Sequence, residues 1–183
     1  GCGNFLIIAY RELRLLEMEV LRELNPKGQR ELDATILSLI DVNQFYGIEY
    51  QEFPARIAET ALWMMDHIMN NRLSLEFGEV FTRIPLKQSP TIVHGDALET
   101  DWEGVLPPER CGFVLGNPPF VGAKFQSTVQ REQVRRIAGL GKSGGTLDYV
   151  CAWFIKAGEY ARGQTRIGFV ATNSITQGEQ VAQ

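Results

Sequence analysis

The spacing of apolar residues predicts a long helix at the start of the chain. Between Phe5 and Leu24, apolar side chains recur about every 3.6 residues, with Arg and Glu on the other face. This stripe consists of Leu6, Ala9, Leu13, Leu16, Val20 and Leu24. The segment Asn25-Pro26-Lys27-Gly28 ends the helix, because proline cannot continue it and glycine permits the exit turn. A second, short helix is expected within residues 31–40.

Short apolar runs between helical patterns predict strands. Residues 44–49 form one run, which ends in Glu49, and Phe53-Pro54 then opens a helix that continues to about Met69, with Pro54 in its first turn. Residues 91–95, 112–115 and 166–171 are predicted to be further strands. A glycine-rich stretch at 139–145 precedes one more helix. The apolar face of that helix consists of Leu147, Val150, Phe154, Ala157 and Ala161.

The alternation of strands and helices predicts an α/β fold, a mostly parallel sheet with helices on both faces. The 183 residues are enough for one domain with a full core. Ligands of such sheets bind at the carboxyl ends of the strands. Glu49, Asp96 and Asn117 each follow a predicted strand, so we expect them on one rim of the sheet.

Composition predicts a cytoplasmic protein without a metal site. The chain is 44% apolar and 22% charged, which is typical of soluble proteins, and it has no run of eighteen apolar residues and no signal peptide. Cys2, Cys111 and Cys151 are widely spaced, which favours free thiols in a reducing compartment. His67 and His94 are distant from each other, and no close cysteine pair accompanies them, so no zinc site is predicted.

The net charge of −4 argues against strong binding of nucleic acid by this chain alone, because proteins that grip a polyanion usually carry a basic face. Either the substrate is not nucleic acid, or the basic surface lies in other sequence. The chain opens on Gly1-Cys2-Gly3, which is typical of the second half of a glycine-rich turn, and it stops in the polar segment Gln177–Gln183. These ends favour a cut from a longer protein.

The tetrapeptide Asn117-Pro118-Pro119-Phe120 is the strongest candidate for a catalytic site. The two prolines remove two backbone donors and fix φ near about −65°, and the first excludes Asn117 from helical conformation. The Asn117 amide and the turn carbonyls can therefore accept hydrogen bonds from an amino group. Phe120 offers a ring on which a planar substrate can stack.

Three segments upstream are candidate nucleotide-binding elements. Gly1-Cys2-Gly3-Asn4 leads directly into a helix, which suits close approach of a ligand, although an ordinary strand-to-helix turn explains it too. Glu49 can accept both hydrogen bonds of a ribose diol, or it is a solvated strand end. Asp96 can accept from an adenine amino group while Ala97 or Leu98 lines the ring, or it closes an Asx turn.

The chain resembles S-adenosylmethionine-dependent DNA methyltransferases that modify adenine at N6, because it has their motifs in the same order. These are Gly-Cys-Gly-Asn-Phe, an acid (Glu49) at the end of what is the second strand in that family, His-Gly-Asp-Ala-Leu and Asn-Pro-Pro-Phe. The arrangement is most similar to the catalytic core of large single-chain restriction-modification enzymes. The resemblance extends from Gly1 to the segment Thr172-Asn173-Ser174-Ile175. It implies the Rossmann-like class I methyltransferase fold and methyl transfer to an adenine flipped out of duplex DNA.

The resemblance also implies roles for individual residues. Asn117 and the Pro118 carbonyl accept from the adenine amino group, and Phe120 stacks on the extruded ring, with Pro119 completing the turn. Tyr149, Trp153 and Phe154 either line the cleft or, for the last two especially, pack in the core. The implied cofactor-binding residues are Gly1, Cys2, Gly3, Asn4, Phe5, Glu49, Tyr50, Asp96, Ala97, Leu98 and Asn117.

The chain departs from the family pattern in two ways. The acid, Pro and Ala-Cys that usually begin the first motif are missing, and so is the target-recognition region expected beyond Gln183. Residues 1–183 are therefore predicted to be a partial catalytic domain, truncated at the first strand and inactive by itself. Two other interpretations stay open: a methyltransferase acting on protein glutamine or RNA guanine, and a methyltransferase-like module without catalysis.

Overall fold

The computed structural model describes residues 2–24, 38–77, 89–139 and 147–176. The chain divides into two compact units, Gly1–Ala97 and Leu98–Gln183, and each is described by itself. Most of the predicted short helix at 31–40 lies outside the described residues, and residues 38–40 are not helical. The glycine-rich stretch beyond Gly139 also lies outside the described residues.

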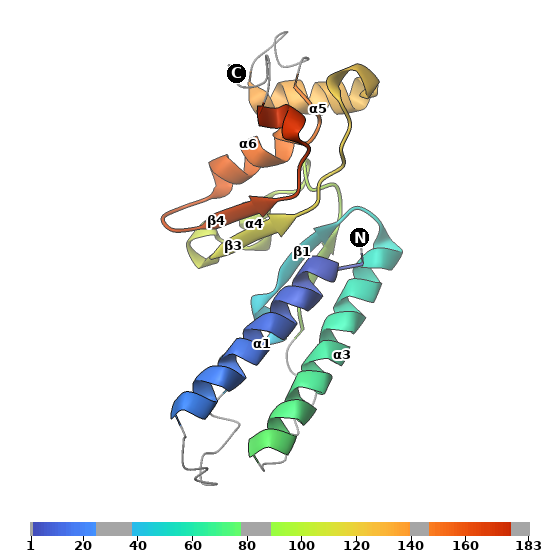
Figure 1. Ribbon diagram of the computed structural model, residues 1–183. Coiled ribbons are helices and arrows are strands. Elements are labelled where there is room, and N and C mark those ends of the chain that lie inside the picture. Colours follow the sequence, from blue (N-terminus) through green and yellow to red (C-terminus); the bar gives the residue numbers. More distant parts are fainter. Residues whose placement is uncertain (1, 25–37, 78–88, 140–146, 177–183) are drawn as a thin grey trace. The chain divides into compact units, whose positions relative to one another are not determined.

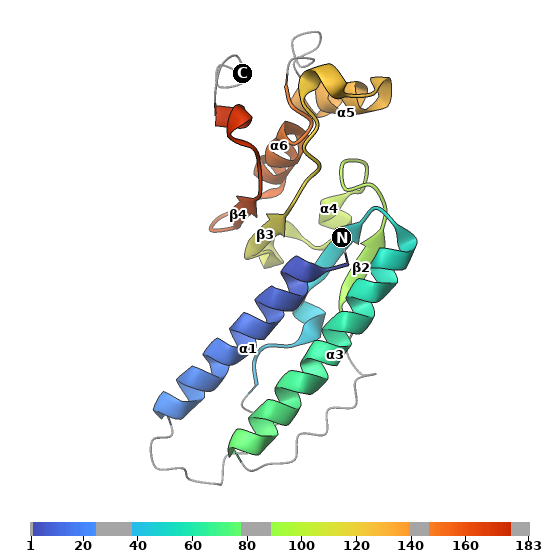
Figure 2. The same ribbon diagram turned by 45° about the vertical axis from the view of Figure 1, so that its right-hand side comes forward.

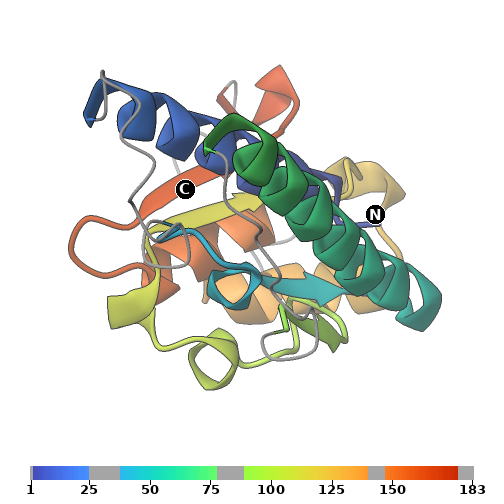
Figure 3. The same cartoon turned by 90° about the horizontal axis from the view of Figure 1, so that it is seen from below.

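The first unit is a helical pair on a two-stranded parallel sheet. Helices α1 (Asn4–Leu24) and α3 (Glu52–Phe77) run side by side (Figures 1 and 2). Strands β1 (Tyr46–Glu49) and β2 (Thr91–His94) pair from Tyr46 with Thr91 to Glu49 with His94. Both helices lie on the same side of this pair (Figure 3). The predicted long helix and both predicted strands are thus confirmed, to within two residues at their ends.

The buried face of α1 is not the apolar stripe that its periodicity suggests. Leu13, Leu16 and Val20 of that stripe are exposed, whereas Tyr10 and Met18 are fully buried. The buried face packs against α3, where Ala58, Leu62 and Leu73 form the opposite side of the core. Because α3 keeps buried positions as far as Leu73, it extends to Phe77, beyond the predicted end near Met69.

Arg14 is completely buried, although the helical pattern places arginine on a polar face. Its guanidinium lies 3.4 Å from Asp66 Oδ1 and donates to Tyr10 Oη at 2.8 Å and to Asn70 Oδ1 at 2.9 Å. Asp66 also accepts from Tyr10 Oη at 2.5 Å and from Asn70 Nδ2 at 3.0 Å. Burial raises the pKa of the Tyr10 phenol, so it stays a protonated donor. The network joins α1 to α3 through buried polar groups, in which both Nη atoms of Arg14 donate hydrogen bonds and its Nε makes none.

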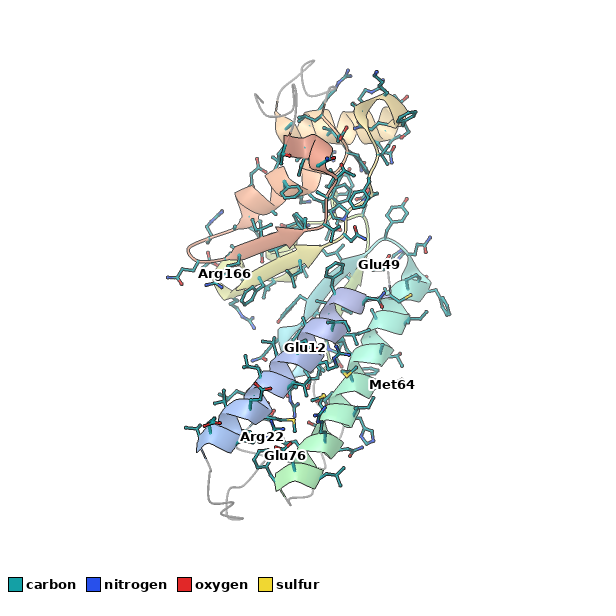
Figure 4. All side chains as sticks on the ribbon, in the orientation of Figure 1. Glu12, Arg22, Glu49, Met64, Glu76 and Arg166 are labelled. Atoms are coloured by element: carbon teal, nitrogen blue, oxygen red, sulfur yellow. The ribbon has the colours of Figure 1, made fainter. Side chains whose placement is uncertain are left out.

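Glu17 extends this network to the segment that leads into β1. Its carboxylate lies 3.2 Å from Arg14 Nε and accepts from the backbone N–H groups of Leu39 and Ile40 at 2.5 and 3.1 Å. A 3-10 helix, Val42–Gln44, follows and is capped by Asp41. At the far end of the helical pair, Arg22 and Glu76 point toward one another and form an ion pair (Figure 4). Charged groups therefore fix both the entry to β1 and the end of the helices.

The second unit contains another parallel pair and two main helices. Strands β3 (Phe113–Gly116) and β4 (Arg166–Phe169) lie side by side (Figure 1), in register from Phe113 with Arg166 to Gly116 with Phe169. Helices α5 (Thr128–Ala138) and α6 (Cys151–Tyr160) pack together, and α4 (Trp102–Val105) is a single turn. The core consists of Leu98, Val134, Leu147, Tyr149 and Ala152.

The predicted parallel pairing is confirmed, but the described residues form two two-stranded sheets and not one continuous sheet. Among the described residues of the second unit, no helix covers one face of its sheet. Phe154 of α6 packs edge-on against Phe169 at 5.1 Å, whereas Phe113 is 64% and Leu115 47% exposed on the opposite face. A parallel sheet with an uncovered apolar face has a strong tendency to bury it against further structure.

Among the described helices, none is both long enough and apolar enough to cross a bilayer. In the same part of the chain, no group of three His, Cys, Asp or Glu side chains is placed to hold a metal ion.

Replacing Arg14 tests the buried network. Arg14→Met leaves Asp66 with no compensating cation in the core, and we expect a loss of about 3 kcal/mol in the free energy of unfolding. Arg11→Met is the matched control, since Arg11 pairs with Glu12 on the surface and its loss is expected to cost about 0.5 kcal/mol or less. Urea unfolding measures both variants. Equal losses would show that the network contributes no more than a surface ion pair.

Candidate active site

In the first unit, the start of α1 lies against the first turns of α3. Gly3 has a left-handed backbone, φ +78°, and its carbonyl accepts from Ile7 N at 3.0 Å in the first turn of α1. A Cβ on Gly3 would lie 2.6 Å from Ala58 Cβ, so a side chain does not fit. Gly1 lies outside the described residues; Cys2, Asn4 and Phe5 are at least partly exposed. The glycine therefore fixes the angle at which the chain enters the helix.

Glu49 and Asp96 follow neighbouring strands of the first unit. Glu49 ends β1, and its backbone carbonyl accepts from Gly95 N at 2.9 Å, one bond beyond the end of the parallel register. That bond connects the residue before Asp96 to Glu49. The Glu49 carboxylate accepts from Gln51 N at 3.3 Å, and Tyr50 is 71% exposed. The predicted placement of both acids at one edge of a sheet is confirmed for this pair of strands.

The start of α3 belongs to the same edge, because α3 begins three residues after Glu49. Figure 4 labels Glu49 at the end of the unit opposite to Arg22 and Glu76. Leu6 in the first turns of α1 lies over β1, where a Cβ on Gly47 would be 3.1 Å from Leu6 Cδ1. The glycine turn, Glu49 and Asp96 thus share one end of the first unit, with two carboxylates and two helix N-termini suited to a nucleoside.

In the second unit, Asn117-Pro118-Pro119-Phe120 leaves β3 at its carboxyl end. The carbonyl of Gly116 accepts from Val170 N at 3.0 Å, which holds the turn beside the segment that leaves β4. Pro118 is buried, whereas Asn117 is exposed and Phe120 is 49% exposed. A buried proline anchors the turn while the amide and the ring on either side remain available to a ligand.

A cavity of about 300 Å³ lies beside the Phe120 ring. Asp148 and Thr172 contribute polar groups to its lining, and Val121, Gly122 and Val150 complete it. Asp148 Oδ1 accepts from Ala123 N at 3.0 Å, so the carboxylate also fixes the loop that follows the turn. The sequence singled out Phe120 but not Asp148. For Thr172, the sequence indicated only that it follows the predicted strand at 166–171.

The aromatic residues considered for the cleft are core residues. Tyr149 is almost fully buried, and its ring meets that of Trp153 edge-on at 5.0 Å. Phe154 packs against Phe169, as described above. None of the three lines the cavity at Phe120. Burial raises the pKa of the Cys151 thiol, which is next to them in the sequence.

Leu98 begins the second unit and is held there tightly. It is 3% exposed and packs with Val134, Leu147 and Ala152. Hydrogen bonds from Gln133 and from Arg136 keep the pKa of the neighbouring Glu99 carboxyl below its usual range, so Glu99 is ionised. The turn that follows Ala97 is therefore held in place by the packing of Leu98 and by the hydrogen bonds to Glu99 within the second unit.

The comparisons with known proteins define the class of protein to which these strand exits and the Asn-Pro-Pro-Phe turn belong. The family model of the MmeI DNA-methyltransferase domain matches residues 1–183, and the chain belongs to this family of DNA methyltransferase domains. DNA methyltransferase A of Bacillus subtilis (strain 168) is 37% identical over 188 residues, which cover 100% of this chain and 21% of that protein.

A solved structure extends the similarity to three dimensions. The Type IIL restriction-modification enzyme MmeI, determined in complex with DNA, matches with a TM-score of 0.91 and 54% identity. The match covers 100% of this chain and 25% of that chain. The chain thus spans about a fifth to a quarter of the relatives that it matches.

Gly3→Ala tests the packing at the start of α1. It combines a left-handed backbone with a clash against Ala58, and we expect a loss of about 3 kcal/mol in stability. Gly163→Ala is the control, because Gly163 also has a positive φ, +57°, but a Cβ there meets nothing within 4 Å. Its expected cost is about 1 kcal/mol. Chemical unfolding compares the two, and a Gly3→Ala variant no less stable than Gly163→Ala would refute the steric argument.

Proposed function

We propose that the chain is the cofactor-binding and catalytic part of a longer S-adenosylmethionine-dependent DNA methyltransferase, which methylates adenine at N6 within a restriction-modification system. The observation that carries this proposal is the Asn117–Phe120 turn beside a 300 Å³ cavity at the carboxyl end of β3. An acceptor amide next to an exposed aromatic ring suits an extruded base with an exocyclic amine. The two relatives, a DNA methyltransferase and a restriction-modification enzyme determined in complex with DNA, support the substrate class.

The first unit supplies groups that fit the cofactor. Glu49 is assigned to the ribose hydroxyls, because a carboxylate at a strand end accepts from both. Asp96 is assigned to the adenine amino group of the cofactor, with Ala97 against the ring, while Leu98, the other residue expected there, packs in the core of the second unit. The turn Gly1–Phe5 brings backbone N–H groups near the ligand, and Tyr50 and Asn117 complete the set. When bound, S-adenosylmethionine supplies an electrophilic methyl group on a sulfonium.

The turn in the second unit holds the acceptor. Asn117 Oδ1 and the Pro118 carbonyl accept from the two hydrogens of the adenine N6 group, which directs the nitrogen lone pair away from them and toward the methyl carbon. With the cofactor bound, Asn117 and Pro118 would hold the nitrogen lone pair toward the methyl group that the sulfonium would supply, and the methylated nitrogen would then lose one proton to solvent. Phe120 stacks on the base and replaces the stacking lost on extrusion.

The DNA-binding surface is assigned to sequence outside this chain. The net charge of −4 is unsuited to a polyanion, and the chain corresponds to only 21% and 25% of its two relatives. We therefore infer a partial catalytic domain whose longer form adds a first strand and a target-recognition region, and which is inactive without them. We also propose a cytoplasmic location, because DNA and S-adenosylmethionine would both be available there.

Labelled transfer tests the proposal against its alternatives. The full-length protein is incubated with S-adenosylmethionine carrying a tritiated methyl group and a mixture of duplex DNA, RNA and protein. The proposal expects the label in DNA. Label in RNA or protein would favour the other methyltransferase interpretation, and no transfer together with no cofactor binding would favour a non-catalytic module.

Two phenylalanines of one loop test the stacking role. Phe120→Ala is expected to lower kcat/KM for DNA methylation about 10- to 100-fold, because stacking on an aromatic ring contributes about 1–3 kcal/mol per base. Phe125→Ala is the control, since Phe125 is 86% exposed five residues later and does not line the cavity. Full activity of Phe120→Ala, or equal losses in both variants, would contradict the assignment.

A further inference from the structure

The turn that follows Asp96-Ala97 is held by a lysine from α6. Lys156 Nζ donates to the carbonyl of Leu98 at 2.8 Å and to the carbonyl of Thr100 at 2.7 Å. Its ammonium also lies 5.6 Å from the centre of the Trp102 ring. A charged donor that binds two backbone carbonyls of one turn holds that turn in place.

A second group of side chains holds the same turn through Glu99. Gln133 Nε2 donates to Glu99 Oε1 at 2.8 Å, and Arg136 Nη2 donates to the same oxygen at 2.6 Å. Gln133 is buried, and its amide oxygen accepts from Tyr149 Oη at 2.6 Å. Tyr149 is thereby connected to the Leu98–Thr100 turn through one intervening side chain.

Tyr149 and its neighbour also hold the loop that leaves the catalytic turn. Tyr149 N donates to the Val121 carbonyl at 2.9 Å, and Asp148 Oδ1 accepts from Ala123 N at 3.0 Å. Val121 follows Phe120 directly and lines the cavity. One dipeptide, Asp148-Tyr149, therefore binds the loop next to the acceptor turn and, through Gln133, the turn next to the cofactor carboxylate.

We propose that Lys156, Gln133 and Tyr149 are positioning residues of the methyl transfer reaction, which hold the Leu98–Thr100 turn on the cofactor side and the Val121–Ala123 loop on the acceptor side in fixed geometry. This inference rests on the proposed function. Lys156 acts on the cofactor side, because both of its carbonyl partners are in the turn that carries Leu98. Tyr149 acts on both sides, since its hydroxyl and its backbone N–H bind different segments.

Replacing Lys156 is expected to affect cofactor binding more than chemistry. In the full-length protein, Lys156→Met releases two carbonyls, and the Kd and the KM for S-adenosylmethionine should rise about tenfold, with kcat changed less than about threefold. Titration calorimetry and steady-state kinetics give these values. Lys156→Arg, which retains a multiple donor, is expected to recover part of the affinity. Arg135→Met, which removes an exposed cation from α5, is the control and should bind cofactor normally.

Tyr149→Phe provides the second variant. It retains the ring against Trp153 and the backbone bond to Val121, and it removes only the hydroxyl that orients Gln133. We expect the cofactor KM to rise about threefold in a protein with an unchanged circular dichroism spectrum. Should Lys156→Met fail to fold, the cofactor KM of Tyr149→Phe tests the proposal in its place.

Wild-type cofactor affinity in a folded Lys156→Met variant, or in Tyr149→Phe when the former does not fold, would overturn the inference while leaving the proposed function intact. Absence of S-adenosylmethionine binding by the unmutated full-length protein would instead overturn the proposed function itself, and this inference with it.

Discussion

Parallel pairing of very short strands is the constraint on which the candidate site depends. In each unit, a backbone hydrogen bond lies just beyond the last paired residues: Gly95 N to the Glu49 carbonyl, and Val170 N to the Gly116 carbonyl. Because both strands of a pair run in the same direction, the segments that leave them emerge together. Each bond therefore brings two exits side by side, Glu49 with Asp96 and Asn117 with Thr172.

The helices hold the segments near these strand ends in position. In the first unit, Gly3 against Ala58 and Leu6 over Gly47 set the start of α1, while the buried pair of Arg14 and Asp66 joins α1 to α3. In the second unit, Lys156 and Tyr149 hold the two loops that flank the site. Several of these contacts are made by polar side chains, whereas the Phe120 ring and the Asn117 amide remain exposed.

The strand exits were predictable from the sequence because they depend on local patterns. A short apolar run followed by an acid or by Asn-Pro-Pro-Phe indicates a strand end without knowledge of the neighbours, and the strand ends at Glu49, before Asp96 and before Asn117 were predicted in this way. Arg14 was not, because its burial depends on Asp66 and Asn70, more than fifty residues away. The same holds for Asp148, whose place at the cavity follows from the packing of α6 and from its bond to Ala123.

Periodicity also misjudged which face of α1 is buried. The stripe through Leu13, Leu16 and Val20 predicts a helix correctly, but Tyr10, Arg14 and Met18 are the residues that meet α3. A helical period identifies a face by its apolar content, whereas burial is decided by which partner helix is present. The parallel direction of the strands was predicted correctly, and the described strands form one parallel pair in each unit.

The position of the transferred methyl group tests the central claim most directly. DNA is treated with the full-length protein and S-adenosylmethionine carrying a deuterated methyl group, then digested to nucleosides and analysed by mass spectrometry. The account predicts deuterated N6-methyldeoxyadenosine and no labelled cytosine, because the Asn117 and Pro118 acceptors are assigned to an adenine amine. Label on cytosine, or its absence from DNA in a protein that binds the cofactor, would contradict the account.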